Sequence, residues 1–82
     1  MEYTEQNYID AIEQLEKEAT PKMAGLDLDL MLLYRDKLET IDQQIEHCRV
    51  AIKNNPGNAH IRRYMLAALQ DKEETLQEIL SI

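Results

Sequence analysis

Three side chains that could hold a metal ion lie near one predicted turn: His47, Cys48 and His60. A zinc site usually has four nitrogen, sulfur or oxygen ligands in tetrahedral geometry. His47 and Cys48 are neighbours on a predicted helix, so their side chains project about 100° apart. The chain has a single cysteine, and no acid lies between residues 47 and 70 to complete the set. We therefore expect no metal or other cofactor, and we expect His60 to be a surface residue.

No other pattern in the sequence indicates a catalytic site. There is no glycine-rich phosphate loop, no nucleophile motif and no readable Ser/His/Asp arrangement. Carboxylates are numerous, but a paired-carboxylate site in a helical protein needs several of them turned inward. None lies on the apolar stripes described below, so we expect that this chain is not an enzyme.

The distribution of charge is more informative. The net charge is −7, yet residues 47–70 contain no acid and include Arg49, Lys53, Arg62 and Arg63. Arg49 and Lys53 would complement the dipole at the end of a helix, whereas Arg62 and Arg63 fall in the first turns of the next helix, where positive charge is unfavourable. Three interpretations stay open: a solvated face, a contact with another copy or another protein, or a contact with nucleic acid or membrane. The net negative charge disfavours nucleic acid as the partner.

These basic residues surround the turn of a predicted helical hairpin. Residues 28–54 carry apolar side chains at alternating spacings of three and four, the pattern of a helix face that packs on a partner helix: Met31, Tyr34, Leu38, Ile41, Ile45, Cys48 and Ile52. Asn54 and Asn55 tolerate the left-handed conformation that ends many helices, and Pro56 cannot continue one. Asn58 is a good N-cap for a second helix over about 58–80. So short a connection predicts two antiparallel neighbours.

Folding about this turn predicts which side chains meet. It places Ile52 near Ile61, Cys48 near Tyr64 and Met65, Ile45 near Ala68, Ile41 near Lys72, Leu38 near Leu76, and Tyr34 near Ile79 or Leu80. Lys72 would then lie on the seam, with its amine directed toward Glu39 or Asp42. Because Cys48 belongs to the apolar stripe, we expect it to be a buried, reduced thiol.

A further helix is predicted before the hairpin, over about residues 5–19. Thr4 would cap it, and Tyr3 and Tyr8 occupy the two positions of a hydrophobic staple. Pro21 disfavours helix at the residue before it, although it could instead open a new helix. We therefore place a linker or a kink at about residues 20–27.

Leucines give the first helix of the hairpin a second apolar face near its N-terminus. Leu26, Leu30 and Leu33 lie off the stripe that begins at Met31. One face would meet the next helix, and the other could take the N-terminal helix or a second copy. We therefore predict one all-α domain over residues 1–82, with three-helix or coiled-coil-like packing, that forms a dimer or a higher oligomer.

The sequence shows no segment for export or membrane insertion. Its first residues are acidic and polar where a signal peptide needs basic and then apolar residues. Its longest apolar stretch is interrupted by Asp27 and Asp29. We expect a soluble segment without a membrane span, and both a cytoplasmic protein and a periplasmic part of a longer protein are compatible with it.

Two parts of the chain resemble known families. The run AIKNNPGNA at residues 51–59 looks like the turn between consecutive tetratricopeptide repeats, although the chain has one such turn and no internal repeat. The runs IDQQIEHCR at 41–49, NPGN at 55–58 and IRRYMLAAL at 61–69 are similar to the helical segment of some bacterial zinc-finger anti-sigma factors. Those proteins also carry a cysteine/histidine domain and a membrane helix, which this chain lacks. For the helical part the resemblance implies a role in association or sensing.

The sequence thus predicts a non-catalytic helical module for protein–protein interaction or oligomerisation. The alternative is a regulatory helical appendage of a membrane-associated anti-sigma factor. A third interpretation is a metal-responsive domain that uses His47, Cys48 and His60. The candidate contact residues are Arg49, Lys53, His60, Arg62, Arg63, Leu26, Leu30 and Leu33.

Overall fold

The computed structural model describes the backbone of residues 2–82 and the side chains of residues 4–82. It consists of three helices: α1 (Glu2–Ala24), α2 (Leu28–Asn54) and α3 (Ala59–Ser81). The described residues form no strand. The predicted all-α architecture, with a long hairpin and an additional N-terminal helix, is confirmed.

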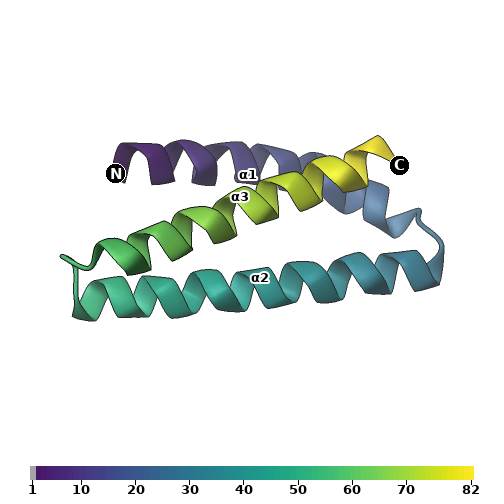
Figure 1. The fold of residues 1–82 in the computed structure, drawn as a ribbon. Coiled ribbons are helices and arrows are strands. Elements are labelled where there is room, and N and C mark those ends of the chain that lie inside the picture. The colour runs from purple at the N-terminus through teal and green to yellow at the C-terminus, as the bar shows by residue number, and fades with distance from the viewer. Residues whose placement is uncertain (1) are drawn as a thin grey trace.

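Helix α3 is central to the packing (Figure 1). It runs antiparallel to α2 and in the same direction as α1. α3 packs against both of the other helices, whereas α1 and α2 make little contact with each other. The resulting domain is long and shallow, with dimensions of 43 × 21 × 14 Å. One consequence is that part of α3 faces solvent rather than a neighbouring helix.

The core lies between α3 and the two helices that flank it. Its buried side chains are Ile12, Ala19, Tyr34, Ile41, Ile45, Met65, Ala68, Leu69, Leu76 and Ile79. Three members of the predicted stripe are thus fully in the core, and Leu38, Cys48 and Ile52 pack against it while half-buried. Thr75 is buried as well, and its hydroxyl donates to the Asp71 carbonyl oxygen at 2.8 Å. This buried polar group is therefore hydrogen-bonded.

The turn between α2 and α3 confirms one cap and corrects another. The Asn58 side-chain oxygen accepts hydrogen bonds from the amides of His60 at 3.0 Å and Ile61 at 3.2 Å, as expected of an N-cap. Asn55 ends α2 with φ −147° and ψ 72°, and its amide donates to two carbonyl oxygens of the last turn. The predicted left-handed ending is therefore wrong. The amide of Asn55 already pairs with the end of the helix without that conformation.

The first helix extends beyond both predicted ends. It begins at Glu2, so Thr4 lies inside it instead of capping it. The side chain of Tyr3, and with it the predicted staple, lies outside the described side chains. Helix α1 also continues through Pro21 to Ala24, so a linker over residues 20–24 is wrong, whereas the alternative of a kink in this region stays a prediction.

Packing explains why the helix survives the proline. Pro21 removes one backbone donor, and its ring crowds the preceding turn. Continuing the helix keeps Ala19 1% exposed and lets Met23 pack against the core. The Thr20 hydroxyl also donates to the Glu16 carbonyl oxygen at 2.8 Å. Tertiary burial therefore outweighs the local preference that the sequence shows.

Candidate contact surface

The predicted basic cluster divides into a half-buried member and exposed members. Arg62 is half-buried, with a side chain 18% exposed. Its Nε donates to the Pro56 carbonyl oxygen at 3.2 Å, and its Nη1 lies 3.6 Å from Oε1 of Glu5 on α1. Arg62 thus links the first turns of α1 to the start of α3. The sequence did not reveal Glu5 as the partner of Arg62, because 57 residues separate the two side chains and no local pattern links them.

The other basic residues lie on the surface at the turn end of the hairpin. Arg49 is 3.7 Å from Glu46 on the same helix, and both side chains are more than half exposed. Such a pair contributes little to stability. Lys53, His60 and Arg63 are exposed, and within residues 4–82 neither Lys53 nor Arg63 forms an ion pair. This end of the molecule therefore presents positive charge that is available to a partner.

Two hollows on the surface meet at Tyr64. The first, of about 350 Å³, is lined by His60, Arg63, Tyr64 and Ala67. The second, of about 390 Å³, lies between α2 and α3 and is lined by Gln44, His47, Cys48, Tyr64, Ala67, Ala68 and Asp71. Tyr64 is 71% exposed, so it forms a wall between two open depressions. Aromatic rings that combine an apolar body with a polar tip are frequent at protein interfaces.

The position of Tyr64 refines the predicted seam. Tyr64 and Cys48 do line the same hollow, as the folding about the turn predicts. The structure leaves Tyr64 outside the core, however, and buries the next residue, Met65, to 4% exposure. Cys48 is free and half-buried. Consecutive residues on a helix project about 100° apart, so the wide apolar stripe of α3 exceeds what its neighbours can cover.

The candidate leucines also separate into two groups. Leu26 and Leu30 pack against the core, whereas Leu33 is 63% exposed. The second apolar face of α2 is therefore partly used within the fold. Sequence reasoning missed two further exposed leucines, Leu28 at 62% and Leu32 at 39%.

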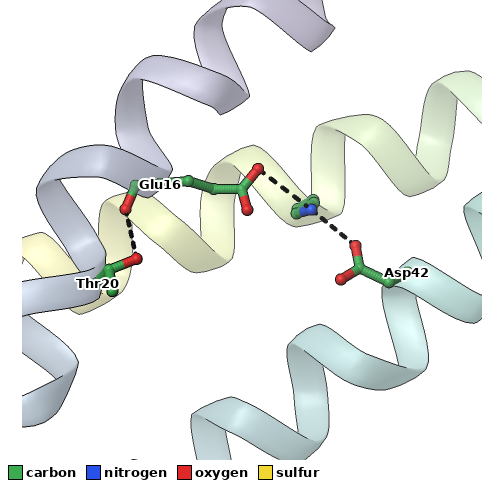
Figure 2. Close-up of polar contacts among 4 residues, drawn as sticks. Glu16, Thr20 and Asp42 are labelled. Atoms are coloured by element: carbon green, nitrogen blue, oxygen red, sulfur yellow. Dashed lines mark hydrogen bonds and ion pairs between the residues drawn. The ribbon is translucent and has the colours of Figure 1, made fainter.

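Lys72 is a charged residue with a structural role. Its Nζ lies 2.7 Å from Asp42 Oδ1 and 3.5 Å from Glu16 Oε1. Figure 2 shows these two carboxylates reaching from α2 and α1 toward the same nitrogen on α3. The predicted direction of the amine toward Asp42 is confirmed, whereas Glu16 was not foreseen. Lys72 joins all three helices and is not a free binding group.

The three candidate metal ligands lie in two neighbouring hollows. Nowhere in residues 4–82 do three or more His, Cys, Asp or Glu side chains cluster in a way that could hold a metal ion. His47 and Cys48 line one hollow, and His60 lines the neighbouring one. Burial raises the pKa of Tyr34, and the nearby carboxylate of Glu78 raises that pKa further. That phenol belongs to the core and not to this surface.

No protein-family model, curated protein or solved structure matches this chain. The resemblance to anti-sigma factor segments therefore stays a prediction from the sequence. Along residues 2–82, no helix combines the length and the apolar character that crossing a bilayer requires.

Proposed function

We propose that this chain is a non-catalytic helical module for protein–protein interaction, and that it acts chiefly through self-association. The observation that carries the proposal is Tyr64, a large aromatic side chain 71% exposed on the central helix. It stands between two hollows, beside an exposed arginine and two small alanines. An exposed aromatic flanked by hollows and by Arg is the composition of an interface centre.

The shape of the domain supports the same function. α3 is covered by α1 and α2 on two sides only, and the molecule is 14 Å deep in its thinnest direction. A small helical domain gains stability when another helix or another copy covers such an open side. The alternative, a regulatory appendage of an anti-sigma factor, would use the same surface to bind a different protein. The resemblance at residues 41–69 is its support.

Sedimentation velocity over a range of concentrations tests the proposal. We expect the wild-type chain to associate at micromolar concentrations, and we expect Tyr64→Ala to weaken association about fivefold or more, as the loss of an interface aromatic does. At concentrations where both chains are monomeric, the melting temperature should stay nearly constant, because the replaced side chain is mostly exposed.

Val50→Ala is the matched control, since Val50 is 51% exposed and lines neither hollow. A wild-type chain that stays monomeric at high micromolar concentration would contradict self-association. Equal effects of the two substitutions would remove Tyr64 from the contact.

A further inference from the structure

One stripe of α3 remains uncovered along nearly its whole length. Its residues follow one another at spacings of four, three, four, three and four, which we call the outer face of α3: His60, Tyr64, Ala67, Asp71, Glu74 and Glu78. All are exposed except Asp71, which is half-buried. This spacing is the one by which helices pair in coiled coils, yet no helix of the described chain covers it.

The hollows continue along this face. Beyond the two that meet at Tyr64, a third hollow of about 560 Å³ is lined by Lys37, Asp71, Glu74, Thr75, Gln77, Glu78 and Ser81. It shares Asp71 with the second hollow, just as the second shares Tyr64 and Ala67 with the first. The three depressions therefore form one row beside α3, from the turn end to the opposite end of the hairpin.

The charge along this row changes sign. The turn end carries His60 and Arg63 and belongs to the stretch without acids, residues 47–70. The middle is apolar or small, with Tyr64 and Ala67. The far end carries Asp71, Glu74 and Glu78 against the single base Lys37. Each copy thus has a positive half and a negative half on one face.

We propose that the occupant of this face is a second copy of the chain, packed antiparallel about a two-fold axis that passes between Ala67 and Asp71. This inference rests on the proposed function and specifies its geometry. In a two-fold interface every contact occurs twice. An antiparallel copy therefore brings both positive halves onto negative halves, whereas a parallel copy would place like charges together. Because each copy has a net charge of −7, such local complementarity is needed to reduce the overall repulsion between copies.

The position of the two-fold axis sets the register of this pairing. With the axis between Ala67 and Asp71, positions 60, 64 and 67 of one copy lie opposite 78, 74 and 71 of the other. Arg63 then lies beside Glu74 of the second copy, and the small side chain of Ala67 lets the two α3 helices approach closely. Leu33 lies one turn before Lys37 on the same side of α2, so the second copy would also cover its exposed side chain.

Charge reversal tests both the partner and the direction. The full chain is measured by sedimentation equilibrium as wild type, Arg63→Glu, Glu74→Arg and the double variant with both changes. We expect each single change to raise the dimer Kd about tenfold or more, because two reciprocal pairs become repulsive. The double variant should restore the Kd to within about threefold, since the charges are exchanged and the pairing is regained.

Arg35→Glu is the control for net charge. It changes the total charge as Arg63→Glu does, but Arg35 lies two residues before Lys37 and projects about 200° away from it. Its Kd should stay within about threefold of wild type. Circular dichroism of each variant checks that the helices are intact.

The outcomes separate the two proposals. A monomeric wild type would overturn self-association, and this inference with it. A dimer Kd that the single reversals leave unchanged, or that the double change does not restore, would overturn the antiparallel pairing. Self-association itself would still hold. Full rescue in the double variant, with Arg35→Glu unaffected, supports a second copy on the outer face of α3.

Discussion

Replacing Lys72 tests how the three helices are held together. Its side chain is 13% exposed, whereas those of its partners Asp42 and Glu16 are 54% and 47% exposed. A hydrogen bond to a charged group contributes up to about 3 kcal/mol, and an exposed ion pair about 0.2–1 kcal/mol. Because both carboxylates are about half exposed, we assign about 1 kcal/mol to the 2.7 Å pair with Asp42 and about 0.5 kcal/mol to the 3.5 Å pair with Glu16.

We predict that Lys72→Met lowers the free energy of unfolding by about 1–2 kcal/mol, because it keeps an apolar stem and loses both pairs. Lys72→Ala should lower it by about 2–3 kcal/mol, since the packing of the stem is lost too. In a domain of this size each kcal/mol lowers the melting temperature by about 4–8 °C. Urea unfolding followed by circular dichroism measures both variants, and Lys17→Met, at an exposed position of α1, serves as the control.

Double-mutant cycles separate the two pairs. Lys72 and Asp42, tested with Asp42→Asn, should show a coupling of about 1 kcal/mol, larger than the coupling to Glu16 measured with Glu16→Gln. Both couplings should fall in about 1 M salt, where exposed charges are screened. Couplings near zero, together with a Lys72→Met variant as stable as the wild type, would refute this reasoning. They would show that neither ion pair of Lys72 contributes measurably to stability.

Three further predictions concern stability. Arg62→Met should lower the free energy of unfolding by about 1–3 kcal/mol, because Glu5 is left buried without its partner. Hydrogen exchange should show that the first turns of α1 lose protection. Arg63→Met, the control, should change the free energy of unfolding little. Pro21→Ala should raise the free energy of unfolding by about 1–3 kcal/mol, since alanine restores a helical hydrogen bond; urea unfolding checks this against Pro56→Ala in the turn, which should give no such gain. The pKa of Tyr34 is raised above 10.0, so the unfolded phenol ionises at lower pH than the folded one. The stability contributed by the neutral phenol is therefore complete below pH 10.0 and is lost as the pH rises toward the raised pKa. Urea unfolding between about pH 8 and pH 11 should show this decline, and Tyr34→Phe should flatten it.

The hairpin could be predicted from the sequence because its signals are local and periodic. The stripe from Met31 to Ile52 has the spacing of one helix face, and Asn58 has the chemistry of an N-cap. The path of α1 could not be predicted in the same way. The local effect of Pro21 argues for a break, and only the packing of Ala19 and Met23 in the core shows why the helix continues.

The contact surface was predictable in part for the same reason. The lack of acids around the turn is visible in the sequence and leads to Arg63 and His60. The pairing of Arg62 with Glu5 depends on how α1 docks, which no spacing encodes. Tyr64 and Met65 are adjacent apolar residues, and only the arrangement of neighbouring helices decides which of them is buried.

The central place of α3 has a consequence for how the chain folds during synthesis. α1 and α2 leave the ribosome first, yet they make little contact with each other. Their apolar faces therefore have no partner until α3 has been synthesised. The hydrogen bond from Gln70 to the Tyr8 hydroxyl spans 62 residues, and that from Lys22 to the Ile82 carbonyl oxygen spans 60. The α2–α3 hairpin can form through contacts that are close in sequence. The apolar face of α1, in contrast, stays exposed to aggregation and proteolysis until α3 has been synthesised.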